Sequence, residues 1–214
     1  MIESIKPYIV SFRLDGIQYI ATIFAPLYFN YWNNIDNIDH CYVLLCGIGF
    51  IYGMIINNYY DYETDLKNNP EKVMLSKLSL NIWSKIFGLM YLTLHLFISA
   101  NSNSIYYKYG SLYAFTLVSI YTKYLKKIIL IKNISTAIYM CFLPIFVFVA
   151  EKHNLEMAYY SSIPLTCLIT IREVMLDICD KSADESANII TLPTLFGIKN
   201  TQNILKLFVI CLWI

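Results

Sequence analysis

The sequence predicts an all-α, multi-span transmembrane helix bundle, and three observations lead to this fold class. The 214 residues are 57% hydrophobic and only 14% charged, and their mean hydropathy is +0.52. The apolar residues form long stretches separated by polar residues, and about 20 apolar residues in a helix cross a bilayer. An ordinary soluble domain carries about 25% charged residues, so the composition argues against a soluble fold.

Six apolar stretches predict six spans, at roughly residues 14–32, 41–60, 79–100, 106–122, 133–150 and 157–178. The apolar stretch from Thr201 to Ile214 predicts part of a seventh span, because it is shorter than the about 17 residues that a crossing needs. The opening residues lack the basic region and cleavage site of a signal peptide, so the first span is expected to remain in the protein. No repeat or Gly/Ser linker divides the chain, and residues 1–214 are expected to form one membrane-embedded domain.

Basic residues orient the predicted bundle. With six spans, the N-terminus and the loops 61–78, 123–132 and 179–200 lie on one side of the membrane. All 16 Lys and Arg residues except Lys108 and Lys152 lie at or near that side. Basic residues concentrate on the cytoplasmic side, so the N-terminus and these loops are expected there. The net charge of +1 gives no reason to expect nucleic acid as a partner.

Nine of the 15 acidic residues fall in two windows on this side, residues 57–72 and 172–185. In the first window, Asn57, Asp61 and Asp65 are spaced four residues apart, so they line one stripe of a helix. Both windows follow an apolar span, and the topology therefore brings them to one face of the membrane.

The second window carries a similar stripe if its helix continues past Asp180, and the stripe then holds Glu173, Asp177, Asp180 and Asp184. Like charges on one stripe repel, and acids at a membrane helix end are costly to desolvate, so a cation is expected to offset them. Mg²⁺ takes one or two carboxylates together with substrate phosphates. Solvated acids at helix ends are one alternative. A transporter ion site is another, although such sites usually lie near the bilayer midplane.

Basic residues complete a candidate anion site. Lys126 is placed to face an anion, with Tyr121 a little over one helical turn before it. Arg172 begins the second acidic window, and arginine recognises phosphate bidentately. The alternatives are a membrane anchor for Lys126 and a snorkelling or ion-paired Arg172. Lys127 and Lys132 are interpreted as cytoplasmic anchors.

A diphosphate on an apolar tail fits this combination of charged ends and apolar spans. Mg²⁺ and the basic residues would stabilise a leaving diphosphate. The tail would become an allylic carbocation, which the aromatic side chains of the bundle can shelter. An electron-rich acceptor would then capture it.

These segments together resemble the UbiA family of intramembrane prenyltransferases. Residues 57–65, NNYYDYETD, resemble the family motif NDxxDxxxD, and residues 69–72 resemble the NxPxRP stretch after it. Residues 172–197 resemble the pattern RExxxDxxDxxGDxxxGxxTLPxxxG, and residues 121–126 resemble a Tyr-Ser-x-x-Leu-Lys element. The resemblance covers roughly residues 10–200.

The resemblance implies a helical membrane enzyme whose active site opens at the cytoplasmic face. It implies transfer of a polyprenyl group from a prenyl diphosphate to a lipophilic acceptor, most often an aromatic ring in quinone-type pathways, with Mg²⁺ as cofactor. The implied ligands of the first Mg²⁺ are Asn57, Asp61 and Asp65, and those of the second are Asp180 and Asp184 with Asp177 near. The implied diphosphate contacts are Lys126, Arg172 and Lys72, with Tyr121 also at the substrate.

The sequence also departs from the family pattern. Residue 58 is Asn where the family usually has Asp, and Lys72 stands where it usually has Arg. Members usually have nine spans, so the chain is expected to be C-terminally incomplete. Residues 13–18, RLDGIQ, faintly resemble the opening of hydroxybenzoate-type members. Arg13 would then pair with an acceptor carboxylate, and a membrane anchor is the alternative.

Other outcomes stay open. The carbocation could be captured within its own chain, as in a membrane terpene cyclase, or by a glycerol-type hydroxyl, giving an ether lipid. The chain could also be a truncated, non-catalytic relative that binds cations.

Overall fold

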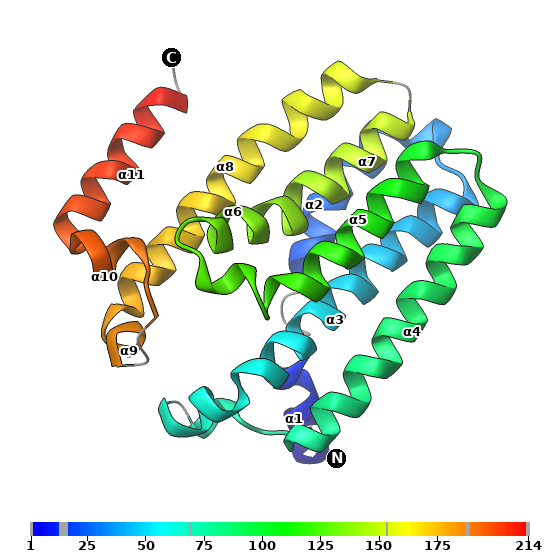
Figure 1. The fold of residues 1–214 in the computed structure, drawn as a ribbon. Helices are drawn as coiled ribbons and strands as arrows, with labels where there is room; N and C mark the ends of the chain where they lie inside the picture. Colours follow the sequence, from blue (N-terminus) through cyan, green and yellow to red (C-terminus); the bar gives the residue numbers. More distant parts are fainter. Residues whose placement is uncertain (1, 13–16, 69, 153, 187–188, 213–214) are drawn as a thin grey trace.

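The protein is described by a computed structural model, in which residues 2–12, 17–68, 70–152, 154–186 and 189–212 are placed. These residues form a bundle of long, tilted helices and contain no strand (Figure 1). In chain order the helices are α1 (Ile2–Ser11), α2 (Ile17–Tyr31), α3 (Asn37–Asn68), α4 (Lys77–Asn101), α5 (Ile105–Tyr121), α6 (Ile131–Ala137), α7 (Leu143–Glu151), α8 (Leu155–Cys179), α9 (Lys181–Ser186), α10 (Leu192–Phe196) and α11 (Ile198–Leu212). Short 3₁₀ turns η3 (Pro70–Lys72) and η4 (Leu125–Lys127) lie in two connections, and a π-helical segment, η5 (Ile138–Phe142), joins α6 to α7.

Within the described residues, each predicted span is helical, and the span 133–150 is divided among α6, η5 and α7. This confirms the predicted all-α membrane fold. Among the described residues, three stretches are long and apolar enough to cross a membrane: Asn37–Lys67, Lys77–Asn101 and Ile131–Glu151. α2 and α5 have 15 and 17 residues, fewer than the about 20 that span a bilayer without tilt. α8 has 25 residues, but its last turns carry the charged residues of the second acidic window.

Polar residues mark where several helices begin. Ser76 before α4, Ser104 before α5 and Asn154 before α8 each accept a hydrogen bond from the backbone N–H three residues later, at 2.9–3.2 Å. Such side chains satisfy N–H groups that the first turn of a helix leaves unpaired. These capping residues separate apolar stretches of the sequence that would otherwise form one continuous hydrophobic segment.

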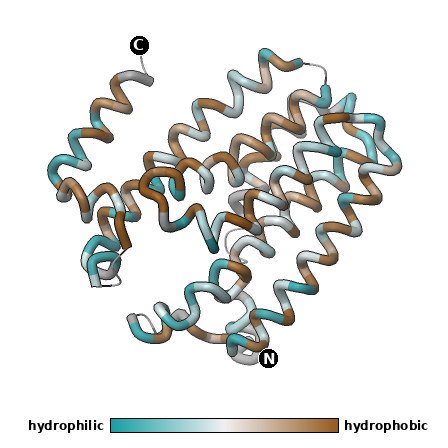
Figure 2. Tube along the Cα trace, viewed as in Figure 1, coloured by the Kyte–Doolittle hydropathy of each residue, from teal (hydrophilic) through white to brown (hydrophobic). Residues whose placement is uncertain are grey.

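The core lies where α2, α3, α4, α7 and α8 meet. Leu45, Ile98, Phe148 and Ala158 have no exposed surface, and Phe24 meets Phe148 edge-on at 5.6 Å between ring centroids. The outward face of α4 is apolar as well, because Leu78, Leu89 and Leu96 are each at least 64% exposed. Figure 2 shows these hydrophobic stretches along the outer helices. A large exposed apolar face is stable where lipid covers it.

At one end of the bundle, a buried carboxylate joins four segments. Asp39, in the first turn of α3, is 1% exposed. It accepts hydrogen bonds from the Tyr107 hydroxyl of α5, from Lys152 Nζ at the end of α7, and from the Asp36 backbone N at 2.8 Å. Lys152 Nζ also donates to the Asn34 carbonyl at 2.8 Å. The buried charge is thus both paired and hydrogen-bonded, as burial of a carboxylate requires.

We expect Asp39→Ala to lower the free energy of unfolding by about 3–5 kcal/mol, because Lys152 would keep a buried charge without its counter-ion. Thermal unfolding in detergent measures this loss. Lys152→Met in the Asp39→Ala background is expected to recover part of it. If the losses of the two single variants add in the double variant, the two residues are not coupled and the interpretation is wrong.

Candidate active site

The opposite end of the bundle carries the C-terminal turns of α3 and α8. Figure 1 places the end of α3, η3 and α9 together at the lower end, and Figure 2 shows hydrophilic segments there. We call this the acidic end, defined by residues 57–68 of α3 and 173–186 of α8 and α9. The two acidic windows therefore lie at the same end of the bundle, as the spans predict.

On α3, the predicted stripe meets Lys126 from η4. Asn57 Nδ2 donates to Asp61 Oδ2 at 2.9 Å, one helical turn further on. Lys126 Nζ forms an ion pair with Asp61 Oδ2 and lies 3.4 Å from Asn57 Oδ1. The Lys126 and Asp61 side chains are 27% and 23% exposed, so the pair is accessible from outside. Asp65 follows one turn later on α3.

On α8, a second lysine meets the second window. Lys132 Nζ lies 2.7 Å from Asp177 Oδ1, and Asn133 Nδ2 donates to Asp177 Oδ2 at 3.0 Å. Both partners stand at the start of α6, directly after Leu130, whose φ of 62° turns the chain there. Lys132 is thus not the cytoplasmic anchor that the sequence indicated. Its position directly after the apolar residues 128–131 gave no signal that it would turn inward to a carboxylate.

The condition for a single acidic stripe, a helix that continues past Asp180, is not met. α8 ends at Cys179, Asp180 caps it with φ −90° and ψ 5°, and the separate helix α9 begins at Lys181. The break divides the stripe, because Asp177 is buried in the bundle while Asp180 is exposed. The backbone leaves the helix here and turns toward α10, which contacts both α8 and α9.

Asp184 is held on α9 with one carboxylate oxygen unsatisfied. Its Oδ2 is buried without a hydrogen-bond partner, while the Thr191 hydroxyl bonds to the same side chain. Burial raises the pKa of Asp184 above its usual value, and the nearby carboxylates of Asp177 and Asp180 raise it further, against the opposing effect of Lys132. A buried acceptor without a partner is unusual and marks a place for a cation or donor.

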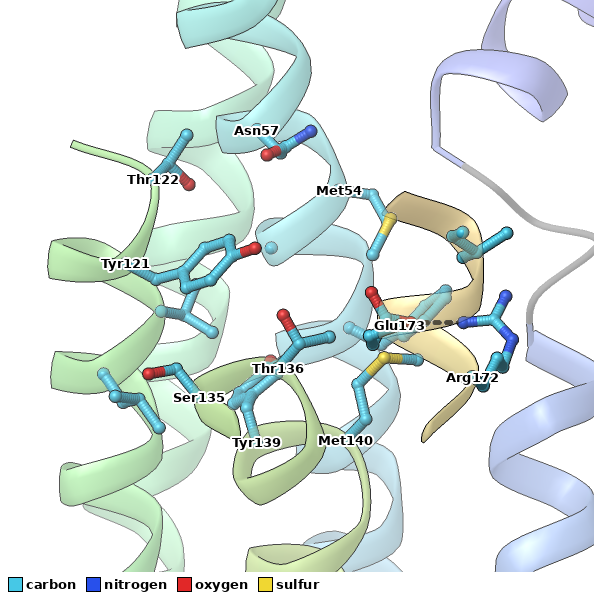
Figure 3. Close-up of a pocket in the computed structure, with 15 residues that line it drawn as sticks. Met54, Asn57, Tyr121, Thr122, Ser135, Thr136, Tyr139, Met140, Arg172 and Glu173 are labelled. Atoms are coloured by element: carbon cyan, nitrogen blue, oxygen red, sulfur yellow. Dashed lines mark hydrogen bonds and ion pairs between the residues drawn. The ribbon is translucent and has the colours of Figure 1, made fainter. Parts of the chain in front are cut away.

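A cavity of about 370 Å³ lies between α3, α5, α6 and α8 (Figure 3). In the figure, Tyr121 points into it from α5, and Met54 and Glu173 face it from the other side. The residues that line it are Phe50, Gly53, Met54, Asn57, Leu117, Val118, Tyr121, Thr122, Ser135, Thr136, Tyr139, Met140, Arg172, Glu173 and Leu176. In Figure 3, Asn57 and Thr122 lie at one end of this lining, and Tyr139 and Met140 lie toward the other.

Arg172 stands at the margin of this cavity. Its guanidinium pairs with Glu173, and its side chain is 55% exposed. Glu173 itself lines the cavity, although the sequence analysis gave it no substrate role. Lys72 lies in η3, and Arg13 lies outside the described residues.

Among the residues that the structure describes, no three His, Cys, Asp or Glu side chains converge into a metal-binding group. The carboxylates instead lie in two sets, and Lys126 and Lys132 pair with one member of each. Mg²⁺ commonly takes one or two carboxylates and completes its shell with water and phosphate. Separate pairs of oxygen donors are therefore compatible with that ion.

The departure at residue 58 has a structural explanation. Asn58 Nδ2 donates to the backbone carbonyl of Ser11 at 2.7 Å, which fastens the end of α1 to α3. Phe12, 7% exposed, packs beside it against the rings of Trp83 and Phe87 at 5.4 and 5.5 Å. An aspartate at this position would turn a carboxylate toward a carbonyl oxygen.

Comparison with known proteins decides the family. The family model of the UbiA prenyltransferase family matches residues 19–214. The chain belongs to the UbiA prenyltransferase family. The family resemblance inferred from the two acidic windows is thereby confirmed.

Two known proteins resemble the chain, one in sequence and one in fold. The chain is 28% identical over 160 residues to digeranylgeranylglyceryl phosphate synthase of Thermococcus sibiricus, across 73% of this chain and 56% of the relative. The chain thus matches little more than half of that relative's length. A solved structure from work on digeranylgeranylglyceryl phosphate synthase in membranes has a TM-score of 0.74 at 20% identity, and the match covers 98% of this chain and 75% of that one. At this identity the likeness concerns the fold.

We expect Asn58→Asp, which restores the usual family residue, to loosen α1. The substitution removes a donor and places a negative group against the Ser11 carbonyl, so a loss of about 1–3 kcal/mol is expected. Hydrogen exchange of residues 2–12 should quicken. Asn58→Ala is the matched control, because it removes the donor without adding charge. Equal exchange in the two variants would contradict the proposed repulsion.

Proposed function

We propose that the cavity binds a prenyl diphosphate, with the diphosphate at the acidic end and the prenyl tail in the interior. The observation that carries this proposal is the position of the cavity. We take as its mouth the end at Asn57, which is hydrogen-bonded to both members of the Asp61–Lys126 pair, and most of the remaining lining is apolar. One compartment therefore offers charge to a headgroup and hydrocarbon to a tail.

The acidic residues fit the Mg²⁺ that members of this family generally use. All are hard oxygen donors, and the unsatisfied buried Oδ2 of Asp184 lacks the cation or donor it needs. We assign Asn57, Asp61 and Asp65 to one ion and Asp177, Asp180 and Asp184 to another. Bound there, Mg²⁺ supplies positive charge to the leaving diphosphate.

Lys126 acts on the phosphate oxygens. Its ammonium group already stands between Asn57 and Asp61, at the mouth of the cavity, and is partly exposed. It can rotate from the carboxylate to an incoming phosphate without leaving its place on η4. Arg172 does the same from α8, where its fork of donors matches phosphate geometry.

The reaction proceeds by ionisation. The bond between the first carbon of the tail and the diphosphate oxygen breaks, and its electron pair leaves with the diphosphate. The face of Tyr121, which lines the cavity near Asn57, stabilises the allylic cation. An electron pair of the acceptor then forms the new bond to carbon, and the acceptor loses a proton.

For the acceptor, we favour a hydroxyl of a prenylated glycerol phosphate over an aromatic ring. The cavity wall carries the hydroxyl groups of Thr122, Ser135 and Thr136, and Thr122 Oγ1 is buried without a partner. Such a wall suits a polar acceptor that can hydrogen-bond to it. The archaeal relative, named as a digeranylgeranylglyceryl phosphate synthase, supports the same choice. The aromatic acceptor of quinone-type pathways remains the competing candidate.

We also propose that the acidic end faces the cytoplasm. Nearly all Lys and Arg residues lie at or near this end, and basic residues concentrate on the cytoplasmic side of membrane proteins. A substrate with a soluble diphosphate headgroup can then enter from the compartment that the acidic end faces.

Diphosphate release from radiolabelled geranylgeranyl diphosphate tests the ionisation site. We expect release by the purified chain in membranes to require Mg²⁺ and to fall about 100-fold or more in Asp61→Asn. Glu63→Gln is the matched control on the same turn of α3. Its carboxylate is 70% exposed, pairs with Lys77 at 2.9 Å and has no proposed role in the site.

Each outcome of that experiment identifies a function. Mg²⁺-dependent release that Asp61→Asn abolishes and Glu63→Gln preserves supports the proposal. Release without acceptor that yields a cyclic product assigns the protein to the terpene cyclases. No release from folded protein under any condition overturns the proposal in favour of a non-catalytic cation-binding relative.

Thr122→Val tests the acceptor. The substitution keeps the shape of the side chain and removes an unsatisfied buried hydroxyl, so the unfolding free energy is expected to stay the same or rise. The KM for geranylgeranylglyceryl phosphate is expected to rise about tenfold, the cost of one hydrogen bond. The same assay with 4-hydroxybenzoate shows whether an aromatic ring is used. An unchanged KM, or capture only by the ring, would refute the hydroxyl acceptor.

A further inference from the structure

The inner end of the cavity is closed by three side chains. Phe50, Tyr139 and Met140 line both this cavity and a smaller space of about 20 Å³ beyond it. The smaller space lies between α3, α4, α5 and the start of α7, and its lining includes Tyr42, Cys46, Tyr91, Ser111, Ala114, Leu143 and Pro144. The same three residues therefore form a partition between two compartments of one channel.

The partition limits the depth of the first compartment. Figure 3 shows Asn57 at one end of the lining and Tyr139 with Met140 at the other. From Asn57 to Phe50 is seven residues along α3, or about 10 Å at 1.5 Å per residue. From Phe50 to Tyr42, at the far end of the second space, is about a further 12 Å. Opening the partition would thus join the small space to the inner end of the large cavity.

Tyr139 is held in this position by α3. A Cβ added at Gly49 would lie 2.7 Å from Tyr139 Oη and 2.9 Å from Tyr91 Cε2. Both distances are shorter than the contacts that Cβ atoms make in proteins. A Cβ at Gly53 would lie 3.7 Å from Tyr139 Cε1. The tyrosine ring therefore lies across two glycines that are one turn apart on α3, with no room for a side chain at the first.

The backbone around Tyr139 also differs from an ordinary helix. Tyr139 and Met140 belong to the π-helical segment η5, between α6 and α7. Such a segment carries one extra residue per turn and often occurs at functional sites. Both Tyr139 and Met140 of this segment line the large cavity and the smaller space.

We propose that Tyr139 is the floor of the tail site and sets the longest prenyl chain that the protein uses. This inference rests on the proposed function and deepens it. Met140 is flexible and can adapt to a tail, and Phe50 is fixed in the core of α3. Tyr139 is the member of the partition whose removal joins the two spaces.

The test compares geranyl, farnesyl, geranylgeranyl and geranylfarnesyl diphosphates as substrates for Mg²⁺-dependent diphosphate release. We expect Tyr139→Ala to shift the ratio of kcat/KM values at least tenfold toward the next longer chain, since one group in a tight apolar pocket discriminates by that much. Tyr139→Leu, which keeps more of the packing, is expected to shift the ratio the same way by less. Gly49→Ala, which pushes the Tyr139 hydroxyl away from α3, is expected to shift it toward shorter chains.

Two control variants distinguish a specific role of Tyr139 as the floor of the tail site from a general loosening of the helix packing. Tyr139→Phe keeps the ring and is expected to keep the wild-type chain-length preference. Tyr106→Ala removes a partly buried tyrosine of α5 that lines neither space, and is likewise expected to leave the preference unchanged. The inference is overturned if Tyr139→Ala leaves the ratio unchanged, or if Tyr106→Ala shifts it equally. Absence of release for every chain length in the wild type instead overturns the proposed function.

Discussion

The structure depends on the pairing of carboxylates on α3 with lysines from later parts of the chain. Asp39 at the start of α3 pairs with Lys152, and Asp61 near its end pairs with Lys126. An unpaired acid in or near the bilayer is costly, so each carboxylate must draw in a cation. These two contacts bring the end of α7 and the α5–α6 connection to opposite ends of one long helix.

The same interaction serves different purposes at the two ends. Around Asp39 the partners are buried, and every contact is made within the protein. Around Asp61 the pair is about a quarter exposed and borders the cavity, so its lysine can exchange one anionic partner for another. The buried Asp39–Lys152 pair contributes stability. The partly exposed Asp61–Lys126 pair leaves a site that can respond to a ligand.

Between the two ends, backbone shape decides the form of the interior. Gly49 and Gly53 flatten one face of α3, and the π-helical segment turns Tyr139 toward that face. Close packing then leaves one large compartment toward the acidic end and only a small space behind the tyrosine. The selectivity of the proposed tail site follows from this packing.

Hydrophobic length and carboxylate spacing are local properties of the chain, so they were enough to predict the membrane bundle, the positions of its helices and the family. The sequence also placed Asn57, Asp61, Lys126 and Asp177 at one end, since topology follows from counting spans. Three features became visible only in the folded chain: Lys132 pairs with Asp177, Asn58 holds α1, and the helix that carries the second acidic window ends before Asp180. Those features arise from contacts between segments far apart in the chain, or from how the chain leaves a helix, and neither the apolar pattern nor residue spacing encodes them.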